Sequence, residues 1–561
     1  MASWGALVLG VASLLLACEA PPAARPRSTG PRALVLIHTA DLHSHLFPEP
    51  LAINATDAAR GLGQSGQVAD VGGFARIASI VKAMRAGAQH SLYLDSGDLI
   101  EGTAAYTQYG GEPELRAYSA LHLGAAALGN HDLDPGPEGF AEQHRRLAQF
   151  PVLAANFADN GSELVSALAK SVVLDANGIR VGVIGVANPS SPSGLGRAGN
   201  VYGVTLLDTA SAVQTEIDRL RPSVDVLVAL THLGLDGDQA LITATSGLDV
   251  VLGGHQHLAL DAALERSDCG PALQAERGCK ARRVVLAHSG ALGRFVGELD
   301  LSLVPASSGD AQSSAFSVET AVHSLIPVSA SVDEDPELAA LLEPYREGLH
   351  AAGFDTPLAF ARARIPRYAA DGGDSALGDA ITDAVRAATG ADLALLNATG
   401  IRADLPPGEL TRSAFVAALP FDDTLTVLTL SGAQLQALFS EQARVASSRE
   451  CQTPVQISGV TLAFKCSGSA STATVRWAGT GAALDPRASY MLVTSAYLAD
   501  GGSGFELLAG ASARRDLDED PLELWLDAVR AMRQSGACPG SALPCLDPAG
   551  LRDGRIRAGR D

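Results

Sequence analysis

The sequence has few aromatic residues, no surplus of positive charge and no apolar segment of membrane-spanning length at its N-terminus. Aromatics make up 5% of the 561 residues while 47% are hydrophobic, so the cores must consist mostly of Ala, Leu and Val. The formal net charge of −21 argues against nucleic-acid polymers and anionic membranes as partners. The N-terminal apolar stretch, residues 4–17, is shorter than the roughly 20 residues of a membrane helix. Because the net charge is negative, an anionic substrate would need a local group of cations.

The N-terminus resembles a bacterial lipoprotein signal, because small residues and Leu lead into Cys18 in the motif LLAC. In such a signal the cysteine is lipidated and becomes the mature N-terminus. No Lys or Arg precedes the apolar stretch, so an ordinary secretory signal and a misassigned start codon remain alternatives. We expect an extracytoplasmic protein, periplasmic or at the cell surface, that touches a membrane only through a lipid anchor on Cys18.

The chain lacks any C-x-x-C pair, which argues against a zinc knuckle. Six cysteines besides Cys18 allow 15 connectivities, but they fall in local pairs within Gly/Pro/Ser-rich segments. Three local disulfides are the favoured arrangement, and they fit an oxidising compartment. The expected pairs are Cys269/Cys279, Cys451/Cys466 and Cys538/Cys545.

Apolar runs alternate with helix-like segments from residue 33 to about 305, a pattern typical of buried strands in an α/β domain. The charged segment 333–350 predicts an amphipathic helix that bridges two domains, and a second mixed α/β unit follows it. The apolar runs are 33–39, 91–97, 125–130, 181–187, 224–230 and 248–254. The expected segments are a signal peptide (1–18), a flexible tether (19–32), a first domain (33–305), a linker (306–356), a second domain (357–535) and a stapled tail (536–561).

Five of the apolar runs are followed by side chains that bind metals or transfer protons. A single such residue is usually a cap or turn residue, but the carboxyl ends of strands in an open α/β sheet converge on one crevice. Carboxylates, imidazoles and one amide, without thiolates, suit two divalent ions. Two such ions share a bridging carboxylate and act on an in-line displacement at phosphorus. The motifs are Asp41-Leu-His43, Gly97-Asp98, Asn130-His131, Thr231-His232 and His255-Gln256-His257.

These five motifs, in this order, resemble those of the calcineurin-like metallophosphoesterases. GGDSALGDAITDA (372–384), NATGIRADLPPG (397–408), ALPFDDTL (418–425) and YLADGGSGF (497–505) resemble the nucleotide-binding domain of the 5′-nucleotidase/UDP-sugar hydrolase family. The resemblance implies a four-layer αββα sandwich, a helical linker and a second mixed α/β substrate-binding domain.

The resemblance also implies a role for each motif residue. Two divalent ions, Zn, Mn or Co, would share Asp98 as a bridge and hold a hydroxide nucleophile between them. His131 would stabilise the phosphoryl group or leaving oxygen, oriented by Asp134, a pairing that general acid/base chemistry also favours. One ion would be held by Asp41, His43, Asp98 and His257, and the other by Asp98, Asn130, His232 and His255. Some family members have Gln or Asn in place of His257.

In the second domain, Asn397 and Arg402 match phosphate and base contacts of the family, and Phe421 and Tyr497 match the aromatic pair that sandwiches the base. The upstream arginine of the family is assigned to Arg367, with Arg364 as the alternative. Two positions depart from the family: Ser503 stands where an Asp binds the ribose, and Asp423 where an Asn is frequent. Structural roles are expected for His38, His45 and His288.

The predicted function is that of a secreted dinuclear-metal phosphohydrolase that releases phosphate from 5′-nucleotides. A 2′,3′-cyclic-nucleotide phosphodiesterase, a UDP-sugar hydrolase and a thiosulfohydrolase would use the same metals and remain alternatives. A non-catalytic surface binding protein is less favoured, since a decayed site should have lost ligands and none of the expected ones is missing.

Overall fold

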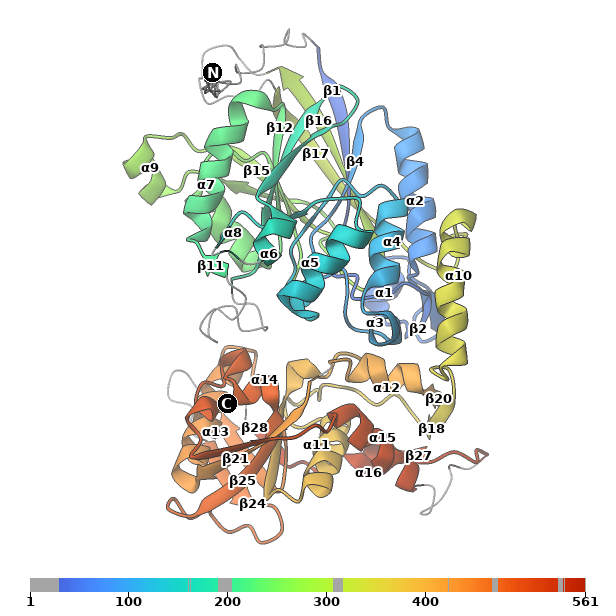
Figure 1. Ribbon diagram of the computed structural model, residues 1–561, viewed down its shortest axis with the longest axis vertical. Helices are drawn as coiled ribbons and strands as arrows, with labels where there is room; N and C mark the ends of the chain where they lie inside the picture. Colours follow the sequence, from blue (N-terminus) through green and yellow to red (C-terminus); the bar gives the residue numbers. More distant parts are fainter. Residues whose placement is uncertain are drawn as a thin grey trace, which may run out of the picture.

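Two α/β lobes are joined by helix α10 (Pro336–Ala351) in the computed structural model (Figure 1). The described residues are 30–159, 161, 163–189, 204–305, 316–421, 423–466, 473–532, 538 and 540–559. The predicted signal peptide, Cys18 and most of the predicted tether lie outside them. In the described part of the chain, no helix combines the length and the apolar character needed to cross a bilayer.

The first lobe contains two sheets packed face to face, with helices on the outer faces. The strand order of one sheet is β17-β16-β1-β4-β5-β6-β8, and that of the other is β14-β15-β13-β12-β10-β9. The first sheet comprises β17 (Phe316–Pro327), β16 (Phe295–Pro305), β1 (Arg32–Thr39), β4 (Ser91–Asp95), β5 (Ala125–Ala127), β6 (Val152–Leu153) and β8 (Leu168–Ala169). The second comprises β14 (Leu264–Ser267), β15 (Arg283–His288), β13 (Val250–Gly253), β12 (Val226–Thr231), β10 (Arg180–Val186) and β9 (Ser171–Asp175).

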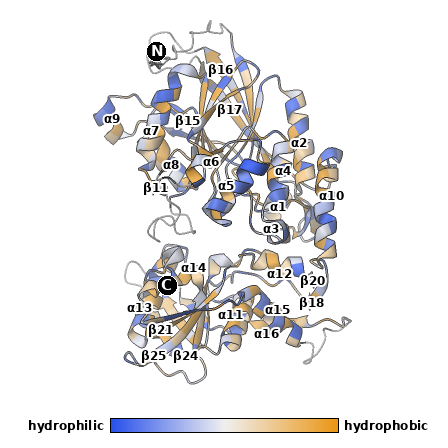
Figure 2. Cartoon of the chain, viewed as in Figure 1, coloured by the Kyte–Doolittle hydropathy of each residue, from blue (hydrophilic) through white to orange (hydrophobic). Residues whose placement is uncertain are grey.

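The core between the two sheets is built from Leu, Val, Ile and Ala, as the composition predicted. Leu36, Val183 and Val228 are among its fully buried members, and Phe316 is the one buried aromatic in this cluster of described residues. Figure 2 shows the apolar residues concentrated on the strands and on the inward faces of the helices. Helix α2 packs on the first sheet, while α7 and α8 pack on the second.

The six predicted apolar runs correspond to β1, β4, β5, β10, β12 and β13. Neighbouring strands among them are parallel: β1, β4 and β5 in one sheet, and β10, β12 and β13 in the other. The register pairs Thr39 with Asp95 and Asp95 with Ala126, so the carboxyl ends of the strands lie level. The loops that follow them face the second lobe (Figure 1).

Helices and small strand pairs complete the first lobe. The helices are α1 (Ala55–Ala59), α2 (Phe74–Gly87), α3 (Ala104–Tyr109), α4 (Glu112–Ala120), α5 (Gly136–Leu147), α6 (Glu163–Ala167), α7 (Thr209–Leu220), α8 (Leu235–Ala244) and α9 (Pro271–Arg277). The pairs are β2 (Glu49–Ala52) with β3 (Val68–Val71), and β7 (Phe157–Asp159) with β11 (Val204–Leu206).

The linker helix α10 packs against the first lobe and leads into the second. Its N-cap residue Asp335 accepts a hydrogen bond from the Leu338 N–H and two from Lys82. Leu338 and Leu342 are buried against the first lobe. The rings of Tyr109 and Tyr345 meet edge to face at 5.0 Å. The helix at 333–350 was thus predicted to within a few residues.

The second lobe has a five-stranded sheet and two three-stranded sheets. Helix α11 begins after the N-cap Ser375 and ends at Gly390 in the left-handed conformation, a typical helix stop. The five-stranded sheet comprises β22 (Val455–Ser458), β19 (Leu393–Asn397), β25 (Ser489–Ser495), β21 (Leu425–Ser431) and β26 (Ala513–Asp516). One three-stranded sheet comprises β20 (Gly408–Thr411), β18 (Pro357–Ala361) and β27 (Cys545–Leu546). The other comprises β24 (Ala473–Trp477), β23 (Val460–Lys465) and β28 (Ile556–Gly559). The helices are α11 (Ala376–Thr389), α12 (Arg412–Ala418), α13 (Gly432–Ser447), α14 (Ala496–Ala499), α15 (Pro521–Ala531) and α16 (Pro548–Leu551). The predicted two-domain α/β fold is confirmed.

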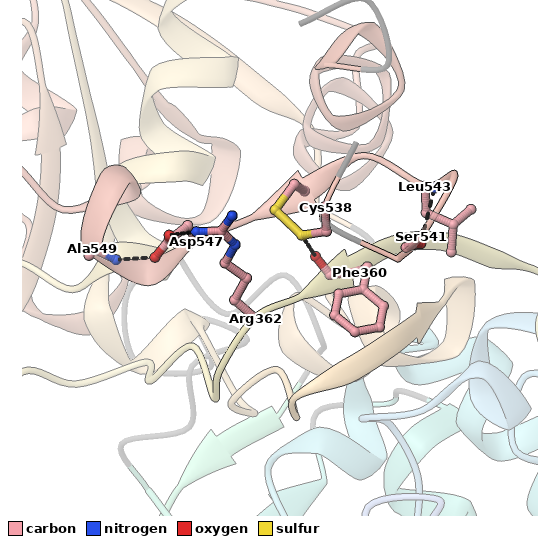
Figure 3. The surroundings of a disulfide bond; sticks show 8 residues. Phe360, Arg362, Cys538, Ser541, Leu543, Asp547 and Ala549 are labelled. Carbon is pink, nitrogen blue, oxygen red and sulfur yellow. Dashed lines mark hydrogen bonds and ion pairs between the residues drawn. A yellow bond between two sulfur atoms is a disulfide. The ribbon is translucent and has the colours of Figure 1, made fainter. Parts of the chain in front are cut away.

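The three local disulfides are also confirmed: Cys269–Cys279, Cys451–Cys466 and Cys538–Cys545. Figure 3 shows the last of them lying against β18, where Cys538 Sγ is 3.7 Å from the Phe360 carbonyl oxygen. The segment predicted as a stapled tail does not stand apart from the second lobe. Its strand β27 pairs with β18, and β28 pairs with β23, so it completes two of the sheets.

Candidate functional site

Five of the seven predicted metal ligands have a backbone conformation that residues with a Cβ rarely adopt. Their φ angles are positive, a strained state that concentrates at functional sites. Hydrogen bonds between neighbouring loops hold it: the Asp41 N–H donates to the Gly97 carbonyl and the His43 N–H to the Asp98 carbonyl. The five residues are Asp41 (51°), His43 (49°), Asp98 (55°), His255 (80°) and His257 (57°).

The seven predicted ligands come together in two adjoining groups at the carboxyl ends of the strands. Ligand atoms of Asp41, His43 and His257 lie within 4.8 Å of one another, and so do those of Asp98, His232 and His255. Asn130 joins the second group, since its Oδ1 is 3.0 Å from His255 Nδ1. The two groups meet where Asp98 Oδ2 lies 3.6 Å from His43 Nε2 and 3.0 Å from His232 Nε2. The assignment of these side chains to metals remains a prediction.

The histidine His232 places a buried ring nitrogen beside the Asp98 carboxylate. Its Nδ1 lies 2.7 Å from the Ser96 carbonyl oxygen, which fixes the tautomer with the proton on Nδ1. Nε2 is buried and forms no hydrogen bond with correct geometry, although Asp98 Oδ2 is 3.0 Å away. With the proton on Nδ1, Nε2 carries a lone pair, and a buried lone pair beside a carboxylate oxygen suits a shared cation.

The ionisation of the two groups is strongly perturbed, as expected for carboxylates and imidazoles buried together. Burial raises the pKa of Asp41 to about 8. Burial alone would lower the pKa of His232, but the neighbouring Asp98 carboxylate raises it to about 10. Burial and, after it, the positive charge of Arg402 from the second lobe lower the pKa of His257 to about 3. A bound cation would compensate the negative charge of the buried carboxylates, which burial alone disfavours.

The carboxylate of Asp132 holds two of the ligand loops together, a role that the sequence analysis missed. It accepts hydrogen bonds from the backbone N–H groups of Gly129 (2.8 Å), Asp98 (3.1 Å) and Leu99 (2.9 Å). The loops approach so closely that a Cβ on Gly129 would lie 2.1 Å from the Asp98 nitrogen. The only sequence signal was the position of Asp132 within the GNHD turn.

His131 is positioned by partners from both lobes. Its Nδ1 lies 2.8 Å from Asp134 Oδ2, and its backbone N–H donates to Asp98 Oδ1 at 2.8 Å. The Phe421 ring of the second lobe stacks on the imidazole at 5.4 Å between centroids. A further buried carboxylate, Glu101, lies 3.9 Å from Nδ1, and the sequence analysis did not predict it.

The predicted substrate residues of the second lobe form two sets of contacts. Arg402 and Arg367 line the same interlobe cavity as His43 and His257, with the Arg402 guanidinium 5.8 Å from the centre of the Phe421 ring. Tyr497 and Ser503 form a pair, in which the Ser503 N–H donates to the tyrosine oxygen at 2.8 Å and the hydroxyls are 3.2 Å apart.

The remaining polar residues singled out in the sequence have partners of their own. Asn397 Nδ2 donates to Thr399 Oγ1, and Arg364 is paired with Asp404. Asp423 accepts the Tyr497 N–H at 3.3 Å, and burial raises its pKa to about 6. The three histidines expected to be structural each contact another side chain: His38 contacts His323, His45 contacts Glu49 and His288 contacts Asp238.

Comparison with known proteins gives matches over both lobes. The family model for calcineurin-like phosphoesterases matches residues 34–259, and the model for the 5′-nucleotidase C-terminal domain matches residues 353–510. An apyrase of Tabanus yao is 28% identical over 473 residues, covering 78% of this chain and 81% of the apyrase. A 5′-nucleotidase of Diplobatis ommata is 25% identical over 535 residues, covering 90% and 88%. The crystal structure of a 5′-nucleotidase precursor from Thermus thermophilus superimposes with a TM-score of 0.78 at 26% identity, covering 94% and 99%.

We expect Asp98→Asn to lower the content of bound divalent metal from two ions per chain to one or none. The substitution keeps the shape of the side chain but removes the negative charge between two dications, where repulsion is strongest. Elemental analysis of the dialysed, folded protein measures the effect. Asp218→Asn is the control, because that carboxylate pairs with Arg277 on the surface. Retention of two ions in Asp98→Asn would contradict the bridging role.

Proposed function

Because this chain belongs to the family that joins a calcineurin-like phosphoesterase domain to a 5′-nucleotidase C-terminal domain, and is a metal-dependent phosphoester hydrolase, we propose that it releases phosphate from nucleoside 5′-monophosphates. One observation carries the proposal. Two groups of side chains on the first lobe that could hold metal ions face Arg367, Arg402 and Phe421 on the second. A phosphate and an aromatic base are the two parts of a nucleotide that such an arrangement recognises.

The chain would hold two divalent ions through residues at the carboxyl ends of its strands. Asp98 would be shared between the ions, and its position between His43 and His232 supports this. The ligands would be Asp41, His43, Asp98 and His257 for one ion, and Asp98, Asn130, His232 and His255 for the other. When bound, the ions would polarise the phosphoryl oxygens and lower the pKa of water, the chemistry on which phosphoester hydrolysis by this family depends.

His131 would donate a hydrogen bond to the phosphoryl group or to the leaving oxygen. Asp134 holds its Nδ1, which leaves Nε2 free to face a substrate. The stacked Phe421 ring restricts the imidazole further. Positioned donors of this kind stabilise the charge that develops in the transition state without having to reorganise.

Arg367 and Arg402 would supply the local positive charge that a protein of net charge −21 needs to attract a nucleotide. Asn397 would contact the phosphate. The base would lie between Phe421 and Tyr497, with Tyr497 fixed through its N–H by Asp423. Ser503 would be the ribose contact, weaker than a carboxylate because a neutral hydroxyl forms weaker hydrogen bonds than a charged group.

We further propose that the protein works outside the cytoplasm, in the periplasm or at the cell surface, with a lipid on Cys18 as its anchor. The three disulfides support an oxidising compartment. The LLAC motif supports the anchor.

Phosphate release from a panel of substrates, with Mn²⁺, Co²⁺ or Zn²⁺ added, tests the proposed activity. We expect 5′-monophosphates to be hydrolysed faster than 2′,3′-cyclic nucleotides and thiosulfonate substrates, and a chelator to abolish turnover. Preference for cyclic nucleotides or for sulfur substrates would replace the 5′-nucleotidase assignment. Binding of nucleotides without any turnover would favour the non-catalytic alternative.

We expect His131→Ala to lower kcat by about 10²–10⁴-fold, the usual contribution of a positioned proton donor, while both metals stay bound. The measurement is steady-state kinetics together with metal content. His350→Ala serves as the control, because that side chain is largely exposed at the end of α10. Loss of metal in His131→Ala would show instead that this histidine is a ligand.

A further inference from the structure

The C-terminal segment, residues 552–556, lies against a loop that helps to line the interlobe cavity. This loop, residues 366–374, which we call the cavity loop, contributes its first five residues, including Arg367, to the cavity wall. Its second half approaches the C-terminal segment so closely that a Cβ on Gly373 would lie 2.3 Å from the Ile556 carbonyl oxygen. The C-terminal segment is therefore in direct contact with a predicted substrate-binding loop.

Two aspartates of the cavity loop hold the C-terminal segment by hydrogen bonds. Arg552 Nη2 donates to both carboxylate oxygens of Asp371, at 2.8 and 2.7 Å. Asp374 accepts the backbone N–H of Gly554 on one oxygen at 3.0 Å and that of Ile556 on the other at 2.9 Å. Because Asp374 is fully buried, these two N–H groups are needed to compensate its charge.

A second fully buried carboxyl group, that of Asp379 on α11, lies beside Asp374. Oxygens of the two side chains lie within 4.8 Å of each other, and a hydrogen bond joins the two groups. Such a bond needs a proton on one of them, because an ionised carboxylate is an acceptor only. Both oxygens of Asp374 already accept backbone N–H groups, while Asp379 Oδ1 accepts no hydrogen bond within the described residues. The shared proton therefore belongs to Asp379.

The charge of Asp379 depends on its burial and on the groups around it. Burial raises its pKa to about 8, the Arg555 guanidinium opposes this shift, and the Asp374 carboxyl group adds to it. Arg555 Nε lies 3.4 Å from Asp379 Oδ1, but the same guanidinium is hydrogen-bonded to Asp383 and Asp553. Loss of the proton would thus place two buried negative charges side by side, with one arginine shared among three carboxylates to compensate them.

The other charged groups near α11 are bound elsewhere. Arg552 Nε lies 3.6 Å from Asp374, but the Arg552 guanidinium is held by Asp371. Strands β19 and β22 and helix α16 carry no titratable side chain, and the Tyr490 hydroxyl of β25 accepts the Asp485 N–H. The charged residues of α15 pair with one another and with Arg412; they are Glu523, Asp527 and Arg530. The protonation of Asp379 is therefore set by Asp374 and by the C-terminal segment.

We propose that the C-terminal segment positions the cavity loop for substrate binding, and that the proton shared by Asp374 and Asp379 keeps the segment in place. The effect on catalysis rests on the proposed nucleotidase function, whereas the contact between the segment and the loop does not. Asp371, Asp374 and Arg552 are positioning residues, because they act on a substrate only through Arg367 and its neighbours.

The contact depends on pH in a defined direction. In alkaline solution the proton of Asp379 passes to solvent, the two carboxylates repel each other, and the segment separates from the loop. The pKa of Asp379 lies above its ordinary value in the folded chain, so the protonated group contributes stability. That stability is fully present below about pH 4, the range of an unfolded aspartate, and is lost as the pH rises through about 8.

Two substitutions of nearly equal shape should have opposite effects on this contact. In Asp379→Asn, the amide nitrogen can donate to Asp374 at any pH and the amide oxygen can accept the Asp553 N–H, so the contact should persist in alkaline solution. In Asp374→Asn, an amide nitrogen would face the backbone N–H of Gly554 or Ile556, so the contact should be lost at every pH.

Hydrogen–deuterium exchange of the full chain, corrected for the intrinsic exchange rates, measures the contact. In the wild type, exchange of residues 368–374 and 553–559 should rise about tenfold from about pH 6.5 to about pH 9, one unit above the pKa of Asp379. In Asp379→Asn the rise should stay below about threefold, and in Asp374→Asn exchange should be fast at both pH values. Equal rises in the wild type and Asp379→Asn, or no rise in the wild type, would overturn the shared proton. If Asp374→Asn does not fold, the wild type and Asp379→Asn decide alone.

Steady-state kinetics separates positioning from a general loss of structure. Arg552→Ala should raise KM for a nucleoside 5′-monophosphate about two- to fivefold, the range expected for a partly exposed ion pair, and should change kcat less than about twofold. The candidate metal groups lie on the other lobe, which is why kcat should hold. Arg552→Lys should restore part of the affinity, because lysine keeps the charge. Arg362→Ala is the matched control: Arg362 pairs with Asp547, outside the cavity loop, and KM should not change.

The outcomes separate this proposal from the proposed function. An unchanged KM in Arg552→Ala, or a loss of kcat without a change in KM, would overturn the positioning role. Turnover of nucleotides together with equal exchange in the wild type and Asp379→Asn would leave the nucleotidase function standing and overturn the proton-dependent contact. If the protein hydrolyses no nucleotide, the proposed function falls, and the exchange experiment still decides whether the proton holds the segment.

Discussion

The carboxylate of Asp98 is the interaction on which the arrangement of the first lobe's site depends. It accepts the backbone N–H of His131 in the GNHD turn and lies beside His232 and His43. The backbone N–H of Asp98 donates to the Asp132 carboxylate. One buried side chain therefore links loops from both sheets. A buried carboxylate is stable only with compensating charge, so the imidazoles around it and the cation that they suit form one unit.

The two lobes contribute opposite kinds of chemistry. The first lobe presents carboxylates and imidazoles at the ends of rigid strands, while Arg367 and Arg402 reach the same cavity from the second. A chain with a net charge of −21 thereby concentrates cations where an anionic substrate would bind. The Phe421 ring stacked on His131 brings the predicted base site directly beside the predicted phosphate site.

Much of the fold was predictable because it follows from local patterns. Six apolar runs became parallel strands, and the predicted ligands at their ends lie together for the same reason. The missed features depend on tertiary contacts. Asp132 bonds backbone groups that precede it by up to 34 residues, and β27 and β28 are short strands whose partners lie far away in sequence.

Anomalous diffraction from crystals of the full chain grown with Mn²⁺ or Zn²⁺ tests the central claim most directly, that two ions share Asp98. The account predicts two peaks about 3.5–4 Å apart, one beside Asp41, His43 and His257 and the other beside Asn130, His232 and His255. A single peak, or peaks away from Asp98, would contradict it.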